Sequence, residues 1–172
     1  MSESLAEYRR KRDFDKTAEP AGGRGAPSEE GAIFVVQRHE ASTLHYDFRL
    51  EVEGVLKSWA VPKGPPMALG ERRLAVPTED HPLEYATFAG KIPQGSYGAG
   101  TVEIWDSGTF RNLRELDVDG PATMAEALAE GKVEFHLAGR KLMGRYALIR
   151  TADEDDERWL WIKMNEESGD EA

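Results

Sequence analysis

The clearest folding signal lies in residues 43–61, TLHYDFRLEVEGVLKSWAV. Apolar and polar residues alternate strictly from Thr43 to Val52, as expected for a strand with one buried face. The apolar face would carry Leu44, Tyr46, Phe48, Leu50 and Val52, and the polar face His45, Asp47, Arg49 and Glu51. Glu53 and Gly54 then indicate a turn, so we expect residues 55–61 to return as the antiparallel partner of a hairpin.

Short apolar or alternating runs continue on both sides of this hairpin. We expect further strands at residues 33–37, 73–76, 100–105, 132–137, 145–150 and 158–164. One helix is expected among them, from Pro121 or Ala122 to Glu130, with Gly131 at its C-cap. Many short strands with a single helix are typical of an all-β barrel or sandwich.

The two ends of the chain differ from this strand-rich body. Residues 4–16 have the charge pattern of a short helix, with Ser4 as its N-cap. Residues 19–30, EPAGGRGAPSEE, are rich in Gly and Pro and are typical of a linker. We therefore expect an N-terminal helix and linker at 1–30, one β domain at 31–165 and a frayed tail at 166–172.

Composition limits the possible classes of protein. The 172 residues suffice for one domain with a real core. The absence of cysteine excludes disulfides and zinc–thiolate sites. The net charge of −10 argues against broad wrapping of a DNA duplex, so any nucleic-acid contact is expected to be local, at a strand end. No apolar run reaches membrane-spanning length, and we expect a cytoplasmic protein without a membrane partner.

Two of the 4 histidines fall in one short segment, QRHEASTLHYDFR, residues 37–49. On one strand face His45, Asp47 and Arg49 would follow one another at about 7 Å. His45 and Asp47 can then share a metal ion, which His39 completes from the preceding turn. Two imidazoles and a carboxylate suit Mn, Fe or Zn. The alternative is an ordinary solvent-facing strand, which we consider less favoured in a chain so poor in histidine.

Other candidate groups lie downstream. Lys63 and Arg73 are cations that could hold a phosphate, although each could equally be a surface charge. Residues 79–85, EDHPLEY, combine His81 with Tyr85, and the near-neutral pKa of a free histidine would suit a general acid or a transition-state donor. His136 alternates with apolar residues and is interpreted as structural. The glycine-rich loop at residues 95–100 is interpreted as a tight turn rather than a phosphate cradle.

Two long runs of the sequence resemble a known family. Residues 37–65, QRHEASTLHYDFRLEVEGVLKSWAVPKGP, and 72–110, RRLAVPTEDHPLEYATFAGKIPQGSYGAGTVEIWDSGTF, are similar to the 3′-phosphoesterase domain of bacterial DNA ligase D and to its stand-alone members. The similarity extends from Tyr8 to Lys163. It implies a compact antiparallel β-barrel with one or two flanking short helices, and a divalent metal, preferably Mn²⁺. Family members remove a 3′-terminal ribonucleoside to leave a 3′-phosphate and then hydrolyse that phosphate to a 3′-hydroxyl.

The resemblance also implies roles for individual residues. The metal ligands would be His39, His45 and Asp47. The residues around the scissile phosphate would be Arg49, His81 and Tyr85. A functional N-terminal segment, part of the stretch interpreted above as helix and linker, would contribute Arg12, Asp13 and Glu19. Supporting, substrate-binding positions would be Gln37, Lys63, Arg73 and Glu79.

The expected partners are DNA or DNA/RNA 3′ ends at primer–template junctions, with a separate DNA ligase, polymerase or Ku-like protein as further candidates. Two rival functions stay open. An iron(II)-dependent oxygenase could use His45, Asp47 and a distal His136 with Arg145 or Arg150. A non-catalytic DNA-end-binding module would bind without metal and release no phosphate.

Overall fold

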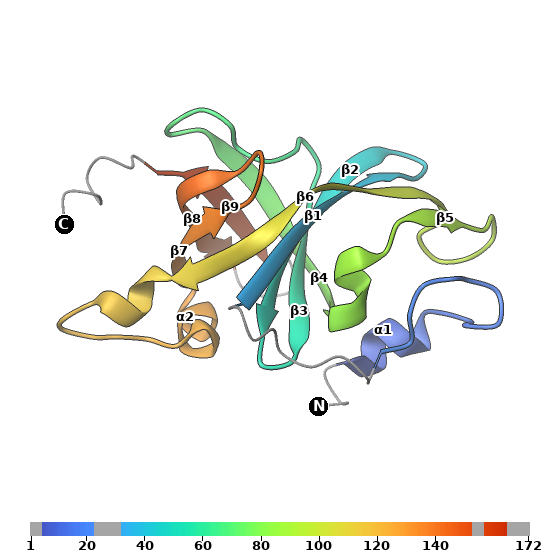
Figure 1. Cartoon of the computed structure of the whole chain (residues 1–172), viewed down its shortest axis with the longest axis horizontal. Coiled ribbons are helices and arrows are strands. Elements are labelled where there is room, and N and C mark those ends of the chain that lie inside the picture. The colour runs from blue at the N-terminus through green and yellow to red at the C-terminus, as the bar shows by residue number, and fades with distance from the viewer. Residues whose placement is uncertain (1–4, 23–31, 153–156, 165–172) are drawn as a thin grey trace.

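The structure, a computed structural model, describes residues 5–22, 32–152 and 157–164. Its body is a closed antiparallel barrel of strands (Figure 1). The strands are β1 (Ala32–Glu40), β2 (Leu44–Val52), β3 (Val55–Val61), β4 (Arg72–Pro82), β5 (Gly90–Ile92), β6 (Gly100–Asn112), β7 (Lys132–Ala138), β8 (Met143–Ala152) and β9 (Arg158–Lys163). Neighbours follow the order β1-β2-β3-β4-β9-β8-β7-β6, and β6 closes the barrel by pairing with β1. The predicted β-barrel is thereby confirmed.

In the described ranges, four short helical segments flank the barrel. They are α1 (Ala6–Arg10), α2 (Met124–Glu130) and two 3-10 segments, η2 (Leu83–Thr87) and η3 (Leu113–Leu116). In Figure 1, α1, η2 and β5 gather on one side of the barrel, and α2 lies on the other. Among the described residues no helix has the length and apolar character needed to cross a membrane.

Alternate residues of the strands build two separate cores. The barrel interior is filled by Phe34, Phe48, Leu50, Phe135 and Trp161, with other apolar side chains. The Phe48 and Trp161 rings stack there with centroids 3.9 Å apart. This packing follows from the alternation in β2, whose apolar face turns inward as the sequence predicted.

A second, smaller core lies outside the barrel wall. It joins Val35 and Leu56 of the wall to Tyr85 and Phe88 of the η2 region and to Tyr8 of α1. These residues follow strand periodicity only in part, so this core was not predicted from the sequence. The N-terminal segment is therefore packed on the wall instead of standing apart from it.

The hairpin agrees with the prediction, whereas several boundaries do not. Glu53 and Gly54 both adopt positive φ, 53° and 88°, as a two-residue hairpin turn requires. The N-terminal helix predicted over residues 4–16 is wrong in length, because α1 covers only Ala6–Arg10. The second helix begins at Met124, after a capping box between Thr123 and Glu126, rather than at Pro121. β6 continues beyond residue 105 to Asn112, and β5 and η2 were not predicted.

Other sequence-based predictions concern residues outside the described ranges. These are the Ser4 cap, most of the linker and the tail at 166–172. The domain boundaries predicted at 30/31 and 165/166 also fall among them and stay predictions.

Candidate active site

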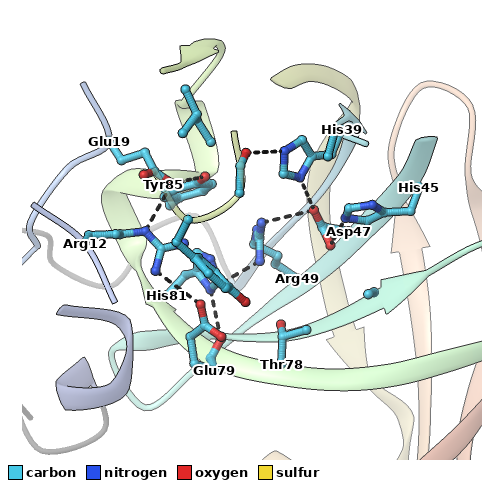
Figure 2. Close-up of a pocket in the computed structure, with 15 residues that line it drawn as sticks. Arg12, Glu19, His39, His45, Asp47, Arg49, Thr78, Glu79, His81 and Tyr85 are labelled. Carbon is cyan, nitrogen blue, oxygen red and sulfur yellow. Dashed lines mark hydrogen bonds and ion pairs between the residues drawn. The ribbon is translucent and has the colours of Figure 1, made fainter. Parts of the chain in front are cut away.

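A pocket of about 330 Å³ opens on the outer face of the barrel wall. Strands β1 to β4 form its floor, and the N-terminal segment, η2 and the loop after β5 surround it (Figure 2). Its lining residues include Arg12, Glu19, His39, His45, Asp47, Arg49, Thr78, Glu79, His81, Tyr85, Tyr97 and Gly98. Most of the charged and histidine residues predicted from the sequence therefore meet in one place.

His39, His45 and Asp47 form a cluster at one end of this pocket. His39 lies on β1 directly opposite His45 on β2, so the prediction that it reaches the site from a turn is wrong. Asp47 follows two residues after His45 on the same face and is only 7% exposed. The candidate ligand atoms of the three residues all lie within 4.8 Å of one another.

The hydrogen bonds of His39 indicate that this cluster can hold a cation. Its Nε2 lies 2.8 Å from the carbonyl oxygen of Gly98, and since a carbonyl only accepts, Nε2 carries the ring proton. Nδ1 then presents a lone pair to Oδ2 of Asp47 at 3.6 Å. Two acceptors face each other there unless a proton or a metal ion lies between them. A backbone carbonyl on the second ring nitrogen is also the usual partner of a metal-bound histidine.

The charges around Asp47 keep it ionised. Burial alone would raise its pKa, but the neighbouring His39 and His45 side chains and the positive charge of Arg49 outweigh burial and hold the pKa well below its ordinary value. Oδ1 of Asp47 lies 3.3 Å from Nε2 of His45. This contact raises the pKa of His45, although burial acts in the opposite direction. The residues thus fit a divalent transition metal bound by two imidazoles and a carboxylate.

Arg49 lies next to the cluster and is held rigidly. Its Nε donates to Oε1 of Gln37 at 2.7 Å, and Gln37 in turn donates to the carbonyls of Tyr85 and Phe88. The guanidinium also lies 4.8 Å from the centre of the Tyr85 ring. With the charge on Asp47 shared by a bound cation, Arg49 would be left to pair with an anion in the pocket. Gln37 thus supports Arg49 from behind the pocket.

His81 reaches the same face because β4 is irregular. The register between β3 and β4 shifts between Leu56 and Ser58, and this extra residue places both Thr78 and His81 on the pocket side. Nδ1 of His81 lies 2.9 Å from the carbonyl oxygen of Glu79 and 3.3 Å from the Arg49 guanidinium. The shorter contact, to an oxygen that can only accept, favours a ring proton on Nδ1. Burial, followed by the charges of Arg49 and Arg12, lowers the pKa of His81 well below its ordinary value. His81 is thus neutral, with Nε2 as an acceptor.

The N-terminal segment is attached to the pocket by buried ion pairs. Arg12, on the turn after α1, lies 3.2 Å from Glu19 and 3.2 Å from Glu79. Glu19 also accepts a hydrogen bond from the Tyr85 hydroxyl at 2.7 Å, and Lys11 pairs with Glu79 at 3.1 Å. The carboxylates and cations compensate one another, which buried charges require. The segment 11–19 therefore forms one wall of the site.

Three predicted site residues lie away from the main pocket. Asp13 lines a smaller adjoining pocket. Lys63 is exposed in the turn after β3, and Arg73 on β4 pairs with Glu71 at 2.8 Å. The sequence analysis did not select two further residues, Tyr97, which lines both pockets, and Lys11, which lines the smaller one. Tyr97 contacts Lys11 and Arg12. The glycine-rich loop that carries Tyr97 was the available signal.

Fold and site together define a closed β-barrel protein whose pocket combines two histidines, a carboxylate and a buried arginine. Residues 37–150 match the family model of the DNA ligase D 3′-phosphoesterase domain. The chain belongs to this family.

Its relatives are larger proteins. The chain is 50% identical over 167 residues to the multifunctional non-homologous end joining protein LigD of Pseudomonas aeruginosa, an alignment that covers 96% of the chain and 19% of that protein. It is 50% identical over 160 residues to the multifunctional non-homologous end joining DNA repair protein LigD of Mycobacterium tuberculosis, covering 93% and 20%. For the LigD protein of Mycolicibacterium smegmatis the identity is 42% over 170 residues, covering 97% and 21%. The chain therefore spans about a fifth of the length of these relatives.

Proposed function

We propose that this chain is a Mn²⁺-dependent phosphoesterase that processes DNA 3′ ends. It removes a 3′-terminal ribonucleoside to leave a 3′-phosphate and then hydrolyses this phosphate to the 3′-hydroxyl needed for ligation. The observation that carries the proposal is the placement of His39, His45 and Asp47 directly beside Arg49 in one pocket. Phosphoester hydrolysis needs this pairing of a metal-type centre with a fixed cation.

The metal would be held by Nδ1 of His39, Nε2 of His45 and the carboxylate of Asp47. When bound, it supplies a Lewis acid for a phosphoryl oxygen and an acidified water. Arg49 binds the phosphoryl oxygens and neutralises the charge that grows on them, and Gln37 keeps its guanidinium aligned. Tyr85 positions Arg49 through its ring and Glu19 through its hydroxyl.

We propose for His81 a role other than the general acid or transition-state donor considered from the sequence. Its neutral ring is protonated on Nδ1, so Nε2 can accept a proton but has none to donate. We assign His81 to accept a proton from the attacking water or from a substrate hydroxyl. Arg12, Asp13 and Glu19 would position the strand, and Glu79 aligns Arg12 and Lys11.

The strand would come from a primer–template junction, and the processed end would pass to a DNA ligase or polymerase, with a Ku-like protein as a further partner. The names of the relatives, which refer to non-homologous end joining, support this setting. Lys63 and Arg73, outside the pocket, would contact the substrate only at a distance from the reacting phosphate.

The proposal is tested with a 5′-labelled primer–template that ends in one 3′-ribonucleotide, incubated with and without Mn²⁺. Stepwise conversion to a 3′-phosphate strand and then to a 3′-hydroxyl strand is expected, in Mn²⁺ only. An unchanged primer in the presence of folded protein and Mn²⁺ would contradict the proposal.

The rival oxygenase finds less support. His136 is exposed on β7, where it pairs across the strands with Arg145, and it does not line the pocket that holds His45 and Asp47. The binding-module alternative leaves the buried, ionised Asp47 without a function, since a carboxylate weakens phosphate binding.

A further inference from the structure

A second, smaller pocket adjoins the first on the side of the N-terminal segment. It encloses about 150 Å³ and shares Arg12, Glu19 and Tyr97 with the main pocket. Beyond these it is lined by Lys11, Asp13, Lys16, Thr17, Gly95 and Ser96. The two pockets therefore adjoin, with Arg12, Glu19 and Tyr97 lying between them.

Tyr97 is an aromatic side chain on a firmly built turn. Ser96 N donates to the carbonyl of Pro93, and Ala99 N donates to the carbonyl of Ser96, both at 3.1 Å. Gly98 follows Tyr97, and its carbonyl oxygen lies 2.8 Å from Nε2 of His39. This contact fixes the turn against the candidate metal centre. Tyr97 nevertheless keeps 48% of its surface exposed, and it lines both pockets, so its side chain is accessible to a ligand.

Cations surround the ring. Lys11 Nζ lies 4.6 Å and the Arg12 guanidinium 5.3 Å from the ring centre. Lys11 also donates to the Tyr97 hydroxyl at 3.3 Å, so the ring orientation is set by the same groups that pair with Glu79. An aromatic ring flanked by cations is the arrangement by which proteins bind single-stranded nucleic acid, the ring stacking on a base and the cations meeting phosphates.

We propose that Tyr97 is a stacking platform for the base of the nucleotide that precedes the scissile 3′-phosphate. The proposal rests on the proposed function, which brings a strand end into the main pocket. The smaller pocket then receives the strand on the 5′ side, where Lys11 and Lys16 meet its next phosphate. Lys11 and Lys16 can pair with a phosphate of the preceding strand, whereas the departing nucleoside carries no further phosphate. The preceding strand is therefore the better occupant of the smaller pocket. This pocket also holds two carboxylates, Asp13 and Glu19, of which Glu19 is paired with Arg12. The cations Lys11, Arg12 and Lys16 outnumber them in its lining.

The test combines a protein change with a substrate change. Binding of a 3′-phosphorylated oligonucleotide is measured by fluorescence anisotropy without divalent metal, for the wild type and Tyr97→Ala. Each protein is measured with a normal base and with an abasic site before the phosphate. For the normal base, Tyr97→Ala is expected to weaken binding about five- to a hundredfold. On the abasic strand the two proteins should bind equally, and Tyr97→Phe, which keeps the ring, should resemble the wild type on both.

Leu116→Ala, at an exposed residue of η3 outside both pockets, is the matched control and should change nothing. Equal losses for Tyr97→Ala on normal and abasic strands would overturn the proposal, because they would show an effect through His39 or the fold. Unchanged binding of Tyr97→Ala to the normal strand would overturn it as well. Phosphate release by the wild type is followed separately in Mn²⁺, and its absence would contradict the proposed function without altering the binding comparison.

Discussion

The inner and outer faces of the same two strands have opposite chemistry. On β1 and β2 the residues Phe34, Phe48 and Leu50 point into the barrel and are buried among apolar side chains. Their immediate neighbours along the chain, among them Asp47 and Arg49, point outward and are almost as deeply buried, at 7% and 3% exposure. The inner residues of these strands thus form the barrel core, whereas the outer residues include the candidate chemistry together with Val35 of the second core.

The two faces differ in what burial costs. Apolar side chains on the inner face gain free energy by leaving water. A buried charge on the outer face costs several kcal/mol unless it is paired and hydrogen-bonded. On the outer face, Arg49 donates a hydrogen bond to Gln37. Arg12, which packs over this face, forms ion pairs with Glu19 and Glu79. Substitutions on the two faces should therefore separate activity from stability.

The largest effect is expected on the outer face. His45→Ala removes a candidate metal ligand and should lower phosphate release from a 3′-phosphate end by more than about a hundredfold, since even the supporting partners of metal ligands are worth ten- to a hundredfold. The melting temperature should change little, because the His45 side chain is partly exposed. His136→Ala, on the exposed side of β7, is the control and should keep full activity. Undiminished Mn²⁺-dependent turnover in His45→Ala would contradict the assignment.

The inner face should give the reverse result. Phe48→Ala removes a fully buried ring that stacks on Trp161 and should lower the free energy of unfolding by about 3–5 kcal/mol. Activity per folded molecule should persist at low temperature, as judged by turnover and denaturant unfolding on the same sample. Phe48→Leu should lose less stability. A loss of turnover without a loss of stability would break the separation between the faces.

A smaller effect is expected where the outer face supports Arg49. Gln37→Met keeps the size of the side chain but removes the acceptor for Arg49 and the donor to two carbonyls. Turnover should fall about ten- to a hundredfold, while Mn²⁺ affinity is kept. Asn112→Leu removes a comparable buried amide, which donates to Ala122 away from the pocket. Stability loss alone is expected there, and equal activity losses in both variants would argue against a specific role for Gln37.

The smallest effect concerns stability against pH. Burial and two arginines lower the pKa of His81 in the folded protein, so below about pH 6.5 the unfolded chain takes up a proton that the folded chain refuses. The contribution of His81 to stability is thus complete above about pH 6.5 and is lost as the pH falls toward the folded pKa. Between about pH 7 and pH 5 the wild type should lose up to about 2 kcal/mol more than His81→Asn. His136→Asn, which keeps His81, should behave as the wild type, and an equal acid sensitivity of His81→Asn would refute a neutral buried His81.

The sequence predicted the hairpin and the polar face of β2 because alternation directly reports which residues share a face. His39, His45 and Asp47 were found as a group because histidine is scarce in this chain. The side of the barrel wall on which His81 lies could not be predicted, because it depends on an irregularity in β4 that leaves no periodic signal in the sequence. The contact of Arg12 with Glu79 joins residues 67 positions apart, and only the resemblance to a family pointed to the N-terminal segment.

The most direct test of the account is to count bound Mn²⁺ by electron paramagnetic resonance in the wild type and in Asp47→Asn, two proteins of nearly equal shape. One tightly bound ion per chain is predicted for the wild type, with loss of this ion and of phosphate release in the variant. Equal Mn²⁺ binding by both proteins, or full activity without any bound ion, would show that the outer face of β1 and β2 is not a metal centre.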